Sequence, residues 1–207
     1  MAGVAATPRR GAPGPVRGRA HWRELPRAAA CAPRSLRPFL LEHGSLSRLL
    51  RAHGRELRVL RLWQGFHAGP AGVLWTREVL LLLDGVPVVW ARSVLQAGAL
   101  RGAWRALRGF GTRPLGDWLF QRPDLRRGPL ELRRLGGAHV LARAAARALG
   151  RAGFEHAACT PLWARRSAFL RRGCALELTE LFLPAAGALR RGAGARTNEA
   201  GGPRQGA

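Results

Sequence analysis

The stretch LWTREVLLLLDGVPVVWARSVL, residues 74–95, decides the fold of this chain more than any other part of the sequence. Two apolar runs flank Asp84 and Gly85. An Asp-Gly pair between such runs is a strong signal for a β-hairpin with a two-residue turn. We therefore predict two antiparallel strands, over residues 73–83 and 86–95.

Pairing across this turn places two arginines opposite each other. Counting outward from Leu83 opposite Val86, Arg77 faces Arg92. Side chains alternate between the two faces of a strand, so both arginines share the face that carries tryptophan and valine, and Glu78 takes the other face.

Like charges directly opposite each other destabilise a sheet, and burying a charge without a partner costs several kcal/mol. The pairing is reasonable if an anion lies between Arg77 and Arg92, since the planar guanidinium binds carboxylates in a bidentate manner. Three alternatives remain open: the face is exposed to solvent, Arg77 extends to the surface or pairs with a glutamate, or the register slips by one residue.

A carboxylate in the stretch CALELTELFLPA, residues 174–185, is the second unusual feature. Alternation places Glu180 between Leu178 and Phe182 on an apolar face, and Glu177 on the other face, where a surface position is expected. Burial raises the pKa of a carboxyl group unless a nearby arginine lowers it again, so Glu180 is a candidate general acid or base. The alternative is a plain ion pair of Glu180 with Arg77 or Arg92.

Two candidate helix starts could supply free backbone N–H groups. In GTRPLGDWLF, residues 111–120, a helix can start at Thr112 or Pro114, and Gly116 keeps the backbone accessible. Free N–H groups at a helix start attract carboxylates, although this signal alone is weak. In the stretch of residues 35–54, Ser45 is a plausible N-cap for a helix that begins at Leu46.

The pattern along the chain predicts one α+β domain over residues 21–188, between disordered tails at 1–20 and 189–207. Strands outnumber helices and short turns separate them, which indicates an antiparallel sheet of about six strands with helices on one side. Besides the hairpin, strands are expected at 57–64 and 128–135 and as a pair within 162–185; a helix is expected at 138–153.

Composition excludes several classes of protein. The formal net charge of +23 accompanies a complete absence of lysine, isoleucine and tyrosine, so we attribute most of the arginine to a GC-rich genome and expect no nucleic-acid partner. The three cysteines form no C-x-x-C pair and no metal-ligand pattern, so neither a disulfide framework nor a metal site is expected. No apolar run approaches the ~18 residues of a membrane span.

Five segments together resemble the chorismate pyruvate-lyase family over residues 36–186: WTREVLLLLDG, ARSVL, TRPLGDWLF, LWARRSAF and LTELFLPA. The resemblance implies a six-stranded antiparallel sheet with helical flaps over an internal ligand pocket. It also implies that the enzyme eliminates pyruvate from chorismate to give 4-hydroxybenzoate for ubiquinone biosynthesis, as a cytoplasmic monomer that needs no cofactor and no metal.

The resemblance also implies roles for particular residues. Arg77 and the backbone N–H groups of Leu115 and Leu46 would bind the ring carboxylate, Arg92 would stabilise the leaving enolpyruvyl group, and Glu180 would handle a proton near the 4-hydroxyl. The sequence departs from the family pattern by a leucine in place of methionine at position 46 and by an insertion over about residues 136–160.

Two other functions remain open. A non-catalytic carboxylate-binding domain of the same fold would need a DNA-binding domain to act as a regulator, and a tail of ~20 residues is too short to hold one. An arginine-rich RNA-binding protein would need basic residues clustered with exposed aromatics, whereas arginine is spread along the whole chain.

Overall fold

The computed structural model describes residues 22–24, 29–154 and 161–190. The predicted tail at 1–20 and all but two residues of the predicted tail at 189–207 lie outside the described residues. The strands are β1 (Arg23–Glu24), β2 (Leu57–Gly69), β3 (Gly72–Leu83), β4 (Val86–Gln96), β5 (Leu125–Arg127), β6 (Glu131–Leu135), β7 (Leu162–Arg171) and β8 (Cys174–Phe182). The α-helices are α1 (Arg37–Leu40), α2 (Leu46–Arg51), α3 (Leu115–Leu119) and α4 (Val140–Arg151), and the 3₁₀ helices are η1 (Ala29–Cys31), η2 (Ala97–Arg101), η3 (Arg105–Gly109) and η4 (Pro184–Ala188).

All the strands belong to one antiparallel sheet, in the order β1-β6-β7-β8-β4-β3-β2, with β5 added beside β7. Three long strands, β2, β3 and β4, follow one another as a meander, and β8 then pairs with β4. The prediction of an α+β domain built on an antiparallel sheet is confirmed. Within the described residues, no helix has the length and apolar character that a membrane crossing requires.

The hairpin of β3 and β4 forms at the predicted turn, but its register shifts within a few residues. Asp84 and Gly85 have positive φ values of 50° and 83°, as a two-residue turn of this kind requires. Leu82 pairs with Pro87, whereas Leu81 pairs with Val89, so β4 holds one extra residue, Val88. Proline cannot donate a hydrogen bond to a neighbouring strand, and a β-bulge beside it is a common result.

The bulge overturns the predicted pairing of the two arginines. Arg77 pairs with Ser93, and Arg92 pairs with Glu78. A shift of one residue moves every later side chain to the opposite face of the sheet. Arg77 and Arg92 therefore lie on opposite faces, and the prediction that they share one pocket is wrong.

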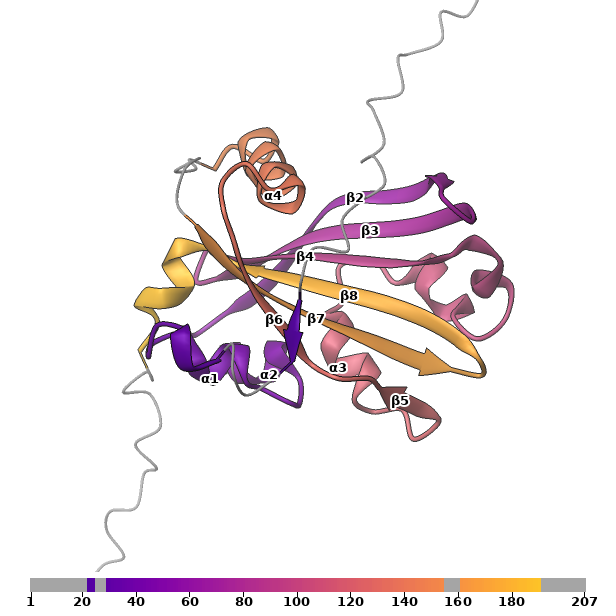
Figure 1. The fold of residues 1–207 in the computed structure, drawn as a ribbon, viewed down its shortest axis with the longest axis horizontal. Coiled ribbons are helices and arrows are strands. Elements are labelled where there is room, and N and C mark those ends of the chain that lie inside the picture. Colours follow the sequence, from indigo (N-terminus) through magenta and orange to yellow (C-terminus); the bar gives the residue numbers. More distant parts are fainter. Residues whose placement is uncertain (1–21, 25–28, 155–160, 191–207) are drawn as a thin grey trace, which may run out of the picture.

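Both faces of the sheet are covered, which corrects the expectation of helices on one side only. Figure 1 shows α1, α2 and α3 on one side of the sheet and α4 on the other. The face under α1–α3 carries the larger apolar cluster, which includes Val79, Leu81, Leu176 and Phe182. The opposite face packs under α4 through a second cluster of leucine, alanine and tryptophan side chains, among them Leu80, Leu82, Trp90, Leu141, Ala145, Leu149 and Leu181.

Candidate active site

Ionisable side chains meet on the sheet face that α1, α2 and α3 cover. Glu180 on β8 pairs with Ala91 on β4, two residues along from the Ser93 that pairs with Arg77. Arg77 and Glu180 therefore share this face, separated by one strand. Strand spacing and rise place their Cα atoms about 10 Å apart across the strands and about 7 Å apart along them, a separation that long side chains can span around a small ring.

Arg77 is a buried cation that has no carboxylate partner among the described residues. Its side chain is 2% exposed. One Nη donates to the carbonyl oxygens of Gly111 and Arg113, at 3.0 and 3.1 Å, and the guanidinium lies 5.5 Å from the centre of the Phe110 ring. Its Nε is buried without a hydrogen-bond partner. Burial, and to a smaller extent repulsion from Arg61, together lower the pKa of Arg77 to about 10.

Glu180 forms an ion pair with an arginine that the sequence analysis did not assign. The Nε of Arg165, directly opposite on β7, lies 2.5 Å from a carboxylate oxygen of Glu180. Arg165 also donates to the carbonyl oxygens of Phe39 and Glu42, at 2.7 and 2.9 Å. Because Glu180 is 7% exposed and Arg165 is 2% exposed, this pair is almost entirely removed from water. The expectation that Glu180 faces inward is confirmed, and Glu177 is half exposed as expected.

A third guanidinium, that of Arg127 on β5, lies beside this pair. Arg127 donates from Nε to the Ser167 hydroxyl at 3.0 Å and from Nη to the carbonyl oxygen of His43 at 2.6 Å. Burial and repulsion from Arg165 lower the pKa of Arg127 to about 10, and Glu180 and Glu42 oppose the shift. Two guanidiniums, those of Arg127 and Arg165, and the carboxylates of Glu180 and Glu42 are therefore close enough to influence one another.

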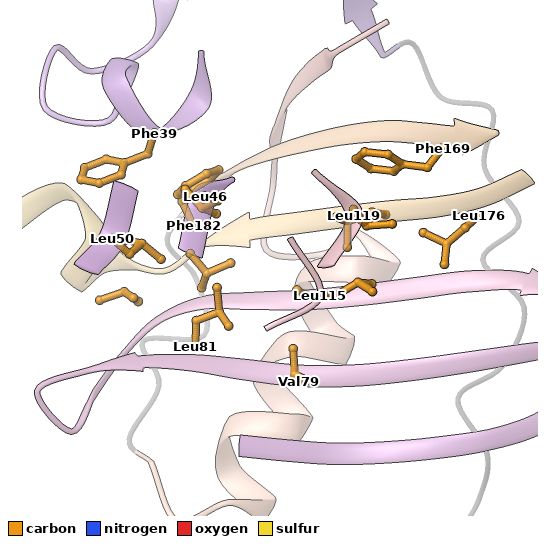
Figure 2. Close-up of a cluster of buried hydrophobic side chains, with 14 of the residues drawn as sticks. Phe39, Leu46, Leu50, Val79, Leu81, Leu115, Leu119, Phe169, Leu176 and Phe182 are labelled. Atoms are coloured by element: carbon orange, nitrogen blue, oxygen red, sulfur yellow. The ribbon is translucent and has the colours of Figure 1, made fainter. Parts of the chain in front are cut away.

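Helices α2 and α3 bring the two predicted backbone donors to the same face. Leu46 is the first residue of α2 and Leu115 the first of α3, and both lie in the apolar cluster drawn in Figure 2. The Ser45 hydroxyl caps α2 by accepting from the N–H of Arg48 at 3.2 Å, which confirms the predicted N-cap. Of the two predicted starts for the second helix, the structure uses Pro114, which is the N-cap of α3.

The starts of α2 and α3 are tied to each other. The Ser45 hydroxyl donates to Asp117 at 2.6 Å, and Arg51 forms an ion pair with the same carboxylate at 2.7 Å. Gly116 permits the close approach, because a Cβ at this position would lie 3.3 Å from the Ser45 hydroxyl. Leu46 and Leu115 are therefore held together over the sheet by a polar link that runs between their helices.

Arg92 lies on the other face, under α4. Its Nε is 3.6 Å from Glu78, and both side chains are almost fully buried. Burial raises the pKa of Glu78, and Arg92 opposes that rise. The sheet separates Arg92 from Arg77 and Glu180, so the structure does not bring together all the residues that the sequence analysis selected.

The signal for Arg165 was present in the sequence. In LWARRSAF, Arg165 alternates with Trp163, Ser167 and Phe169, a pattern that places it on an apolar face. Arg127 gives no such signal, because β5 is short and only the tertiary fold brings it beside Ser167. The fold and the site together define an α+β protein with ionisable groups buried between an antiparallel sheet and short helices.

Comparison with known proteins places this chain in a family. A family model described as chorismate lyase matches residues 17–188. A protein of Thiobacillus denitrificans named a probable chorismate pyruvate-lyase is 42% identical over 165 residues, which cover 74% of this chain and 85% of the relative. A protein of Azoarcus sp. with the same name is 42% identical over 175 residues, covering 78% of this chain and 90% of the relative. The chain belongs to the chorismate lyase family, a family of carbon–oxygen lyases.

The fold is also found in a solved structure of a different kind. The effector domain of PhnF from Mycobacterium smegmatis superposes with a TM-score of 0.51 at 16% identity, covering 69% of this chain and 90% of that one. At this level of identity the likeness concerns the fold alone.

Proposed function

We propose that this protein is a chorismate lyase, which eliminates pyruvate from chorismate to give 4-hydroxybenzoate. Membership of the chorismate lyase family supports the proposal. Within the site, the observation that supports the proposal is the buried Arg77. Arg77 has no carboxylate partner among the described residues and lies on the same face as the Glu180–Arg165 pair. A substrate carboxylate would be the anionic partner of Arg77.

The roles proposed for the residues are those that the family resemblance implies, and the positions of Arg77 and Glu180 on one face support them. Arg77 and the N–H groups of Leu46 and Leu115 bind the ring carboxylate, because a guanidinium and two amides can satisfy its oxygens. Glu180 lies toward the other end of the ring, at the 4-hydroxyl and C4. Arg92 is left out of this assignment, because the sheet lies between it and the other groups.

The reaction itself needs little chemical assistance. The C4–H bond and the C3–O bond break, the ring becomes aromatic, and enolpyruvate leaves and takes up a proton to become pyruvate. Aromatisation provides the driving force. The enzyme has to hold the substrate in the reactive geometry, stabilise negative charge on the leaving group and accept the C4 proton. In this assignment Glu180 accepts the proton, and Arg165 fixes its carboxylate in one orientation.

Burial of all these groups implies that the site opens and closes. Arg77 is 2% exposed and is held by the carbonyl oxygens of Gly111 and Arg113, just before α3, so substrate can reach its guanidinium when this segment moves. Apolar side chains and short helices then exclude water from the ring. We further propose that the protein is a cytoplasmic monomer that supplies 4-hydroxybenzoate to ubiquinone biosynthesis without a cofactor, a metal or a nucleic-acid partner.

The experiment is incubation of the purified protein with chorismate, followed by separate measurement of 4-hydroxybenzoate and pyruvate. We expect the two products in equal amounts, at a rate proportional to enzyme concentration. Tight binding of 4-hydroxybenzoate without turnover would instead indicate a non-catalytic ligand-binding domain of the same fold. Formation of neither product, together with no binding, would reject the proposal.

A further inference from the structure

A second concavity lies outside the site described above, and arginines dominate its walls. It has a volume of about 400 Å³ and lies where η2, η3 and α3 approach the turn between β7 and β8. Nine residues line it: Arg101, Gly102, Ala103, Arg105, Ala106, Trp118, Arg122, Arg171 and Arg172. Five of the nine are arginines and none is acidic.

The general excess of arginine in this chain does not account for that concentration. At the chain-wide frequency of 35 in 207, nine residues would hold one or two arginines rather than five. Within the part of the chain that the structure describes, the ion pair formed by these arginines is that of Arg171 with Asp124, at 2.8 Å. The pocket therefore keeps a local excess of positive charge among the described residues.

Two of the guanidiniums are held in place before any ligand arrives. Arg171 donates to Asp124 at 2.8 Å and to the carbonyl oxygen of Ala103 at 2.6 Å. Arg122 and Arg171 both lie against the Trp118 ring, at 4.7 and 5.7 Å from its centre. Fixed donors bind an anion more tightly than mobile ones, because less side-chain entropy is lost on binding.

The turn between β7 and β8 brings one more arginine to the pocket. Arg172 and Gly173 are the two central residues of this turn, with φ values of +48° and +74°, as a two-residue hairpin turn requires. The turn places Arg172 in the same concavity as Arg101, Arg105 and Arg122.

We propose that this pocket, lined by five arginines, binds a small anion with two or more negative charges, specifically a phosphate group. Arginine recognises phosphate through paired hydrogen bonds. A planar carboxylate is satisfied by one or two guanidiniums, whereas the tetrahedral oxygens of a phosphate accept from several directions at once. The volume suits a small molecule such as pyrophosphate or a phosphate ester.

Occupancy of the pocket has a consequence for α3, and this consequence rests on the proposed function. Trp118 lines the pocket, and Leu115 on the same helix lies in the apolar cluster on the sheet face that carries Arg77 and Glu180. An anion that bridges Arg122, beyond the end of α3, to Arg172 restrains this helix against the sheet. Release of 4-hydroxybenzoate should then be slower when the anion is bound.

The test is calorimetric titration of the full-length protein with pyrophosphate, at an ionic strength held constant with sodium chloride. The variant Arg101→Ala/Arg105→Ala should weaken binding about tenfold or more, since hydrogen bonds between charged groups are being removed. Arg172→Asn should also weaken it severalfold while suiting the left-handed backbone, so loss of folding cannot explain the effect. The control Arg58→Ala/Arg143→Ala removes two exposed charges elsewhere and should leave affinity within twofold.

Two outcomes would overturn the site. One is an equal loss of affinity in the control variant, which would show that only the overall charge matters. The other is an RNA oligonucleotide that binds more tightly than pyrophosphate at equal phosphate concentration. Neither measurement uses chorismate, so failure of the lyase proposal would leave them interpretable. A release rate for 4-hydroxybenzoate that saturating pyrophosphate does not change would overturn the restraint on α3.

Discussion

Glu180 and Arg165 face each other directly across the β7–β8 pair, with 2.5 Å between carboxylate oxygen and Nε and almost no exposure to water. Removing one partner of a buried ion pair typically costs about 3–5 kcal/mol, because the other charge stays buried alone. We therefore expect Arg165→Met to lower the free energy of unfolding by about that amount, measured by urea denaturation. The double variant Arg165→Met/Glu180→Leu should recover part of the loss without recovering turnover. A single variant that is as stable as the unmodified protein would show that the pair is not a structural element.

Arg77 should bind a ligand carboxylate only while it carries its charge. Its pKa is lowered to about 10 by burial. Affinity for benzoate, whose own carboxylate does not titrate in this range, should be constant below about pH 10 and should fall as the pH rises through that value. Arg77→Met should bind benzoate weakly at every pH. Unchanged affinity in Arg77→Met at neutral pH would remove Arg77 from the binding site.

The Glu78–Arg92 pair should contribute to the free energy of unfolding and take no part in the lyase reaction. Burial holds the pKa of Glu78 above its ordinary value of 4.5, so the folded protein binds more protons than the unfolded chain above that pH. Its contribution to stability is full below pH 4.5 and is lost as the pH rises through the folded value. Arg92→Met should steepen this loss, toward the limit of about 1.4 kcal/mol per pH unit for one group.

The control for that prediction is Glu78→Leu/Arg92→Met, in which the titrating group is absent and the pH dependence should disappear. Because both residues lie under α4, chorismate turnover by this folded double variant should stay within a few-fold of the original. A loss of turnover comparable with that of a Glu180 variant would restore Arg92 to the catalytic site.

The difference between expectation and structure at Arg92 has a physical cause in the hairpin. The Asp84–Gly85 turn and both strands were predictable, because turn chemistry and apolar runs are local signals. The bulge at Val88 was not deduced, because an unbroken run of apolar residues from Val79 to Leu83 is buried on both faces and contains no polar residue that would reveal the register. Pro87 was the available clue, since it cannot take part as a donor in a regular ladder.

The same apolar run was also the clue that helices would cover both faces of the sheet. A strand that is apolar on both faces indicates cover on both faces, and α4 provides it through Leu141, Ala145 and Leu149. The inward position of Glu180 followed from simple alternation along β8, which has no bulge in its pairing with β4 or β7. Its partner Arg165 comes from another strand, and a partner of this kind depends on strand order that local patterns do not contain.

The link between α2 and α3 should affect the release of product. Asp117→Ala removes the 2.6 Å hydrogen bond from Ser45 and the ion pair with Arg51. We expect a loss of about 1 kcal/mol in the free energy of unfolding and faster dissociation of 4-hydroxybenzoate, measured by stopped-flow displacement. The control Glu56→Ala removes an exposed pair with Arg58 and should change neither quantity. Slower dissociation in Asp117→Ala would contradict the idea that this link holds the site closed.

The most direct test of the lyase account compares two glutamates on one strand. Glu180 faces Arg165 inside the protein, and Glu177, three residues earlier on β8, is half exposed on the opposite face. The measurement is the rate of 4-hydroxybenzoate formation from chorismate by the unmodified protein, Glu180→Gln and Glu177→Gln. The account predicts a loss of about 10²–10⁴-fold for Glu180→Gln and almost no change for Glu177→Gln. Equal rates in the two variants, or no 4-hydroxybenzoate from the unmodified protein, would contradict it.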